Sequence, residues 1–322
     1  EPSEKVLTMI KMASAFLINF LHPNLTAGGE YMSRNTEYII PSGFVYLAPL
    51  DENAKIITAF NFVALTAGAG IGPDSLDDRY LCYILYNWLQ AGIYLDNDRQ
   101  QIDIKGYLKN RRLDLFFKDS GLRVIQNENY YLAANLYKGG VFRLYDAGGR
   151  EYLDSGVEIK YRGRRLIANV LDYGNKIKIN NEFMEASGCL KPVRERLMIT
   201  PFLLLFKLWQ MTLGRIGGTQ ILLKRFLRKE MITYKKSGGV FFRREFVMTD
   251  NKIAVNDEVG APLKEKDFYC GLKTSYNFIP SSKYFTFQEI NNSSGLGDKQ
   301  YFSTAKASCL RRTFYLSNKS SN

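Results

Sequence analysis

The chain has 322 residues and carries 44 Lys and Arg against 32 Asp and Glu, which gives a formal net charge of +12. Hydrophobic residues make up 46% of the chain and charged residues 24%, a globular composition that excludes wholesale disorder and a collagen-like fibre. The four cysteines are widely spaced and His22 is the single histidine, so we expect no zinc site, no other metal and no cofactor.

The first hundred residues show helical periodicity. Residues 3–21 contain no Gly or Pro, and their apolar residues recur at steps of three and four, so a helix is predicted that ends before Pro23. A second helix is predicted over 51–66, where apolar residues nearly surround the axis and indicate deep burial. A third is predicted over 75–90, because a serine cap and two acidic residues open it.

From about residue 102 the pattern changes to short apolar runs separated by Gly, Asn and Asp. Strand-length runs at this spacing favour an antiparallel sandwich over alternating strands and helices. We therefore predict a multidomain α+β protein, with a helical domain over 1–102 and an antiparallel β-sandwich domain over 103–322. Two apolar segments interrupt the strands, so residues 199–231 are predicted to be a helical insertion.

This insertion is also strongly basic. Residues 191–236 hold eleven Lys and Arg but only two Glu, a net charge of +9. On the second helix of the insertion, four cations share the arc opposite the apolar one: Lys224, Arg225, Arg228 and Lys229.

Three interpretations of the basic insertion remain open. Its apolar arc could pack on a sheet, with the basic arc merely solvated. It could instead lie in the interface of an anionic membrane, as basic amphipathic helices do. Finally, the basic face could bind an acidic polymer, with polysaccharide favoured over nucleic acid because zinc-finger spacing, an RNP-like motif and a convincing helix-turn-helix are all missing from the sequence.

The polar segment 28–38 stands between two apolar helical runs and begins with two glycines. A polar loop at the end of a helical array is a natural ligand site, although its Arg and Glu could equally satisfy helix termini. His22, just before Pro23, is interpreted as the partner of a helix C-terminal dipole rather than as a base. Tyrosine can act as both base and acid when a nearby cation lowers its pKa.

The run YMSRNTEYIIPSGFVYLAP, the helices after it and the β-rich region resemble the carboxyl-terminal half of the heparinase II/III-like proteins. The segment PFLLLFKLWQMTLGRIGGTQILLKRFLRKEMIT is similar to an insertion in uncharacterised bacterial and archaeal members. Those proteins join an α/α toroid to a large antiparallel β-sandwich. The resemblance implies that residues 1–100 are the last helices of a toroid whose remainder lies upstream of Glu1.

Lyases of this family cleave uronate polysaccharides by β-elimination, in which a cation or amide neutralises the carboxylate and Tyr or His moves the protons. The resemblance implies roles for residues of matching type: Arg34 or Asn35 as neutralising groups, Tyr31 or Tyr38 as base or acid, His22 as a distant reserve, and Glu30, Glu37 and Arg34 as substrate contacts. The family also draws a histidine from the sandwich, and residues 103–322 contain none, which weakens the expectation of activity.

Three functions follow as hypotheses. The first is a lyase or lyase-like protein acting on an acidic glycan, expected if Tyr, Arg and Asn cluster between the domains. The second is a catalytically silent glycan-binding or polysaccharide-assembly protein, expected if aromatics gather without a proton-transfer pair. The third is a membrane-surface protein, expected if the apolar arc of the insertion is exposed. The sequence shows neither a signal peptide nor a membrane span, and the resemblance implies a periplasmic, extracellular or membrane-peripheral location. Oligomeric state stays open.

Overall fold

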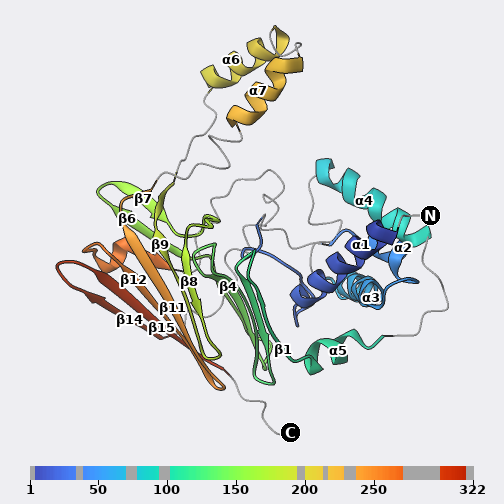
Figure 1. The fold of residues 1–322 in the computed structure, drawn as a ribbon, viewed down its shortest axis with the longest axis horizontal. Helices are drawn as coiled ribbons and strands as arrows, with labels where there is room; N and C mark the ends of the chain where they lie inside the picture. The colour runs from blue at the N-terminus through green and yellow to red at the C-terminus, as the bar shows by residue number, and fades with distance from the viewer. Residues whose placement is uncertain are drawn as a thin grey trace.

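The computed structural model has helices at one end of the molecule and antiparallel sheets at the other (Figure 1). It describes residues 4–33, 39–69, 78–93, 102–193, 200–212, 217–227, 237–270 and 298–316. The helices of the first part are α1 (Glu4–Leu17) with the short 3-10 helix η1 (Ile18–Phe20), α2 (Pro41–Leu47), α3 (Glu52–Thr66), α4 (Asp78–Ile93) and α5 (Ile104–Asn110).

Local sequence explains where several of these helices begin. Pro41 occupies the first turn of α2, where its fixed φ suits the helix and its missing N–H is not needed. The Asp51 carboxylate accepts a hydrogen bond from the Ala54 N–H at 3.1 Å and caps α3. The first two predicted helices are confirmed as α1 with η1 and as α3. The third is confirmed as α4, while its predicted start at Ser75 lies outside the described residues.

The helix α5 was not predicted, because the sequence after residue 102 reads as strand. Asp103 caps α5 through the Gly106 N–H at 2.9 Å, and Ile104 and Leu108 are buried in the same apolar cluster as Ile57 of α3. The first strand begins only at Leu113, so the helical elements extend beyond the boundary that the sequence predicted.

The strands in the described part of the chain form three antiparallel sheets. The five-stranded sheet follows chain order: β1 (Leu113–Phe117), β2 (Leu122–Gln126), β3 (Tyr130–Asn135), β4 (Val141–Asp146) and β5 (Glu151–Asp154). The six-stranded sheet has the order β14 (Asp298–Ser303), β15 (Ser308–Tyr315), β12 (Lys252–Val259), β11 (Phe241–Thr249), β9 (Phe183–Cys189) and β8 (Lys176–Ile179). The smallest has the order β10 (Lys191–Pro192), β7 (Arg164–Ile167), β6 (Val157–Tyr161) and β13 (Phe268–Cys270).

The central strands β2, β3 and β4 of the five-stranded sheet are buried on both faces. Alternate side chains point to opposite faces, and one set packs on the six-stranded sheet, where the Phe142 ring lies 5.4 Å from Phe246 and 5.7 Å from Phe314 between centroids. The other set faces the helical part, where Tyr131 and Tyr145 join Phe20 in a second cluster. This second face is therefore the junction between the helices and the sheets.

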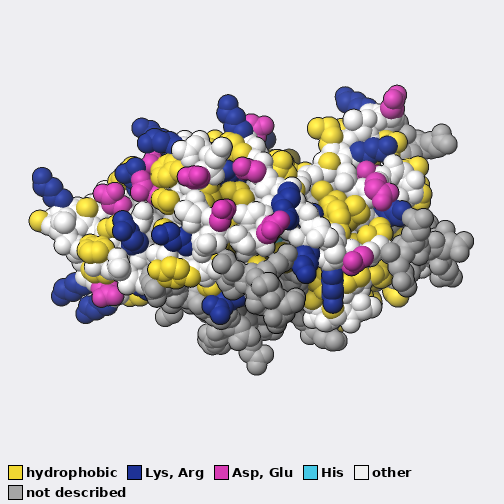
Figure 2. All heavy atoms as spheres, turned by 90° about the horizontal axis from the view of Figure 1, so that it is seen from below, with side chains coloured by type: hydrophobic (Ala, Val, Ile, Leu, Met, Phe, Trp, Pro, Cys, Tyr) yellow, Lys and Arg dark blue, Asp and Glu magenta, His cyan; other side chains and the backbone are white. Residues whose placement is uncertain are grey.

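The helical insertion is confirmed between β10 and β11. It consists of α6 (Thr200–Met211) and α7 (Gly217–Leu227), which stand apart from the sheets and the other helices in Figure 1. Within the described part of the chain, no helix is both long and apolar enough to cross a membrane. On the face drawn in Figure 2, Lys and Arg side chains are interspersed with Asp and Glu, so the described residues form no continuous basic surface there.

A group of paired charges lies between the five- and six-stranded sheets, in addition to the apolar cluster that packs there. We call it the inter-sheet network, and its members are at most 1% exposed: Asp154, Arg244, Asp257 and Arg312. Arg244 Nε lies 2.5 Å from Asp257 Oδ1 and its Nη1 lies 3.1 Å from Asp154 Oδ1, while Arg312 bonds to both carboxylates. Asp154 ends β5 and the other members lie on the opposite sheet, so the network ties the two sheets together.

Candidate functional site

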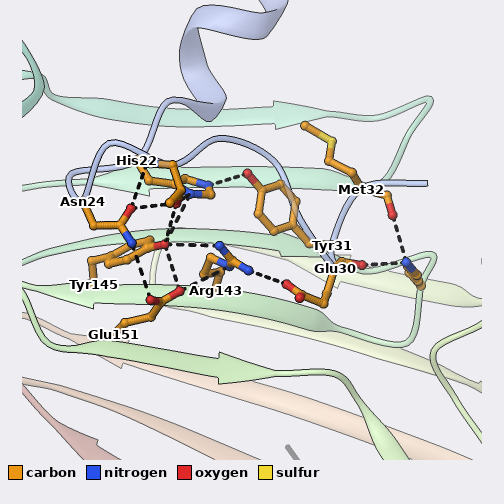
Figure 3. A network of polar contacts seen from close by, with 10 residues as sticks. His22, Asn24, Glu30, Tyr31, Met32, Arg143, Tyr145 and Glu151 are labelled. Atoms are coloured by element: carbon orange, nitrogen blue, oxygen red, sulfur yellow. Dashed lines mark hydrogen bonds and ion pairs between the residues drawn. The ribbon is translucent and has the colours of Figure 1, made fainter. Parts of the chain in front are cut away.

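The site is built on the segment that follows η1 and runs across the junction face of the five-stranded sheet. We call it the crossing segment. The segment turns sharply, with the His22 N–H donating to the Thr26 carbonyl at 2.8 Å and Leu25 at a φ of 67°. Gly28 and Gly29 follow at φ values of 72° and 106°, which a glycine adopts without steric cost. The turn brings His22 and the residues after Gly29 onto the same face of the sheet (Figure 3).

His22 and Tyr31 form a hydrogen-bonded pair at the centre of the site. The His22 Nε2 atom lies 2.8 Å from the Tyr31 hydroxyl, and both side chains are fully buried. The other ring nitrogen, Nδ1, lies 2.8 Å from the Thr26 hydroxyl, which itself donates to Asn24 Oδ1 at 2.7 Å. Since that hydroxyl proton is already used, the network assigns the imidazole proton to Nδ1 and the lone pair to Nε2. Tyr31 therefore donates to His22.

The five-stranded sheet completes the surroundings of this pair with aromatic side chains. The rings of Tyr131 on β3 and Tyr145 on β4 lie 5.5 Å and 5.3 Å from the imidazole ring, between centroids. The Tyr145 hydroxyl donates to Glu151 Oε1 at 3.0 Å and lies 3.3 Å from His22 Nδ1. The imidazole thus lies between tyrosines of the sheet and Tyr31 of the crossing segment.

An ion pair lies beside the tyrosines. Arg143, also on β4, places Nη2 2.7 Å from Glu30 Oε2 and Nε 3.5 Å from Glu151 Oε1. Both side chains of the Arg143–Glu30 pair are largely buried, with 4% and 11% exposed. The predicted contact of Glu30 with a substrate would require this ion pair to open.

Two side chains, one at the end of β3 and one just after it, hold the crossing segment by its backbone. Lys138 Nζ donates to the carbonyls of Glu30 at 2.6 Å and Met32 at 2.8 Å, and Asn135 Nδ2 donates to the Tyr31 carbonyl at 2.9 Å. Burial lowers the pKa of the Lys138 ammonium to about 8, although the nearby Glu30 favours its charge. These contacts fix the position of Tyr31 relative to the sheet.

We refer to this whole assembly as the junction network. Its members are His22, Asn24, Thr26, Glu30, Tyr31, Tyr131, Asn135, Lys138, Arg143, Tyr145 and Glu151. It reaches the surface at Asn24, which is exposed, and at Glu151, whose side chain is 37% exposed.

The electrostatics of the central pair favour neutral groups. Burial, followed by the charges of Arg143 and Arg111, holds the pKa of His22 well below its usual value. Burial, followed by the neighbouring Tyr131, raises the pKa of Tyr31 well above its usual value. Near neutral pH the proton therefore rests on Tyr31, and His22 is a neutral imidazole that can accept it.

The interpretation of His22 as a helix-dipole partner is wrong. Arg111 takes that place, because its guanidinium donates to the carbonyls of Ile18 at 2.7 Å and Leu21 at 2.6 Å, at the end of η1. A cation at a helix C-terminus satisfies carbonyls that lack intrahelical partners. This leaves both ring nitrogens of His22 for Thr26 and Tyr31.

Of the predicted catalytic residues, the structure therefore brings together His22 and Tyr31. Four other predicted site residues lie outside the described residues: Arg34, Asn35, Glu37 and Tyr38. Of the predicted basic contacts, Arg225 is exposed on α7 and Lys224 lies on the same helix, while Arg228 and Lys229 are outside the described residues.

The sequence missed the contribution of the sheet. Arg143 and Tyr145 stand two residues apart on β4, and Tyr131 stands on β3, so their side chains share one face. Period-two spacing of polar and aromatic residues in otherwise apolar strands was the available signal. Among the described residues, no three His, Cys, Asp or Glu side chains gather as they would around a metal ion.

No family model matches the chain, and no curated protein matches it.

Proposed function

We propose that the protein is a heparinase II/III-like polysaccharide lyase that cleaves an acidic, uronate-containing glycan by β-elimination. In this proposal α1–α5 are the last helices of an α/α toroid, and the sheets form the β-sandwich that is joined to it. The observation that carries the proposal is the pair of Tyr31 and His22, 2.8 Å apart, at the junction between the helices and the sheets. A protein that only binds glycan needs aromatic and polar contacts but no proton-transfer pair.

The geometry of the pair suits the proton transfers of β-elimination. The reaction removes the proton next to the uronate carboxylate, breaks the neighbouring C–O bond and forms a carbon–carbon double bond. The Tyr31 oxygen would take the carbon-bound proton while its own proton passes to Nε2 of His22. Tyr31 would then protonate the departing glycosidic oxygen, which keeps the electron pair of the broken bond, and the imidazolium would return its proton to Tyr31.

This route avoids a free phenolate on Tyr31. Burial raises the pKa of Tyr31, so an isolated phenolate would be disfavoured. Passing the phenolic proton to an acceptor already 2.8 Å away removes that requirement. The charge that develops on the substrate carboxylate would be neutralised by Arg34 or Asn35, which follow Ser33 in the sequence.

Access is a condition of this mechanism. The Tyr31 and His22 side chains are fully buried, so a glycan can reach the hydroxyl only after a local opening of the residues that cover it. Glu151 and Asn24 form the edge of the junction network nearest the solvent.

The proposal is tested with uronate polysaccharides and the ultraviolet absorbance of unsaturated products. The full-length protein, with any natural upstream segment present, should produce this absorbance on at least one polymer. Tyr31→Phe should lower kcat by roughly 100-fold or more, because it deletes the transferred proton and keeps the ring. Tyr152→Phe is the matched control, since Tyr152 is a buried tyrosine on the opposite face of the sheet, and it should retain activity.

A flat absorbance trace from folded wild-type protein on every polymer would overturn the lyase proposal and favour glycan binding without turnover. Equal losses in Tyr31→Phe and Tyr152→Phe would remove Tyr31 from catalysis. The carboxylate-neutralising role is tested separately by Arg34→Ala, which should lose activity while keeping the thermal unfolding midpoint of the wild type.

A further inference from the structure

Helix α6 presents an apolar face to solvent. Leu204, Leu208 and Met211 recur at steps of four and three and so share one side of the helix, with Leu205 beside them. Their exposed fractions are 59%, 60%, 68% and, for Leu205, 63%. Large apolar side chains gathered at such exposure indicate a surface that meets a partner.

The helix pair also carries positive charge. Lys207 is exposed on α6, and on α7 the exposed Arg225 lies close to the side of the helix that carries Ile221 and Leu222, which are 56% and 67% exposed. The sequence around both helices, residues 191–236, has eleven Lys and Arg against two Glu.

We propose that the helix pair α6–α7 docks on an anionic lipid membrane, with its leucines in the interfacial layer and its cations at the headgroups. A lipid interface is the partner that offers an apolar layer and an anionic layer side by side. An acidic polymer would neutralise the cations but leave the leucines in water. A second copy of this chain would bring the same positive charge to the contact and be repelled.

The dimensions favour a helix pair that lies in the interface. Twelve residues of α6 span about 18 Å, less than the ~30 Å hydrocarbon core. The pair also stands away from the sheets and the other helices, so a membrane could meet it without displacing the core (Figure 1). This proposal concerns attachment and stands whether or not the junction network is catalytic.

Vesicle flotation tests the proposal directly. The full chain should float with vesicles of phosphatidylcholine mixed with phosphatidylglycerol, and much less with phosphatidylcholine alone. Leu204→Ser/Leu208→Ser should weaken binding to the anionic vesicles at least roughly tenfold, because it removes two of the inserted side chains. The matched control is Leu89→Ser/Ile93→Ser, which changes two exposed apolar residues at the same spacing on α4 and should bind as the wild type does.

Charge reversal separates lipid from other acidic partners. Arg225→Glu should also weaken flotation with anionic vesicles, and added salt should reduce it further. The proposal is overturned if the wild type floats with neither vesicle type, or if the α4 control loses as much binding as the α6 variant. It is equally overturned if the leucine variant keeps full vesicle binding while Arg225→Glu alone abolishes it, because an acidic polymer site would behave in that way.

Discussion

The protein contains two buried polar networks of opposite character, one on each face of the five-stranded sheet. The inter-sheet network consists of full charges in closed pairs, and all its members are at most 1% exposed. The junction network is centred on the neutral pair His22 and Tyr31 and reaches the surface at Glu151. Burial alone is therefore shared by both networks and does not distinguish structural from functional groups.

What separates them is whether a proton can move. Arginine keeps its charge at any ordinary pH. Burial alone would raise the pKa of Asp257, but the guanidinium groups of Arg244 and Arg312 outweigh it and hold that pKa below its usual value. In the junction network, a neutral imidazole already accepts a hydrogen bond from a phenol. The inter-sheet network is thus suited to holding two sheets, and the junction network to proton transfer.

The largest expected effect comes from breaking the inter-sheet network. Arg244→Met should lower the free energy of unfolding by about 3–5 kcal/mol, because it leaves Asp154 and Asp257 buried without one of their cations. Its neighbour on β11 offers the control: Arg243, whose side chain is 39% exposed, pairs with Glu185. Glu185 keeps a second cation, Lys178, at 3.4 Å, so Arg243→Met should cost clearly less than Arg244→Met. Denaturant unfolding measures both, and equal losses would mean that burial does not set the strength of these pairs.

The second expected effect is a pH dependence of stability that Lys138 of the junction network produces. Lys138 has a pKa of about 8 when folded, against 10.5 as the reference value. Below pH 8 the folded state bears the full cost of a buried ammonium, and between pH 8 and 10.5 the unfolded chain binds more protons, so stability rises with pH. The total gain in the free energy of unfolding over this pH interval approaches about 3 kcal/mol.

Urea unfolding of the wild type and Lys138→Met at a series of pH values isolates this contribution. The difference in the free energy of unfolding between the two proteins should change between pH 8 and 10.5, because all other titrating groups are common to both. Parallel stability curves for the two proteins would contradict the assignment of a buried, charged Lys138.

Much of the helical framework could be predicted from local sequence, because periodicity and caps act within a few residues. The cap at Asp51 is of this kind. The short helix α5 could not, since it contains Gly106 and gains its place by burying Ile104 and Leu108 against distant helices. A seven-residue helix has little stability of its own, so tertiary packing decides it.

The candidate site shows the same contrast between local sequence signals and long-range contacts more clearly. Tyr31 and His22 could each be named from sequence, but their pairing depends on the left-handed turn at Leu25 and on sheet residues such as Asn135, which follows Tyr31 by 104 residues. The role of His22 was misassigned because Arg111, the true partner of the η1 carbonyls, is 90 residues away from Leu21. Long-range contacts of this kind leave no local signature.

The smallest of the three effects tests the protonation state on which the catalytic proposal rests. His22 is the only histidine in the chain, so no other imidazole titrates between pH 6.5 and about 5. Burial and two arginines keep it neutral when folded, whereas the unfolded chain takes up a proton below pH 6.5. The unfolded state then binds more protons, so the free energy of unfolding should fall as the pH decreases below 6.5.

His22→Gln should be less stable at pH 7, yet its stability should be nearly flat over the same interval. Asp257→Asn serves as the comparison from the inter-sheet network: it should lose stability at every pH and keep the wild-type slope, because its charge does not titrate there. A wild-type slope near zero above pH 5 would mean that folding does not keep His22 neutral, so that the folded protein takes up the same proton as the unfolded chain. Nε2 could then not accept the Tyr31 proton below pH 6.5, and the protonation state assigned to the pair would be wrong.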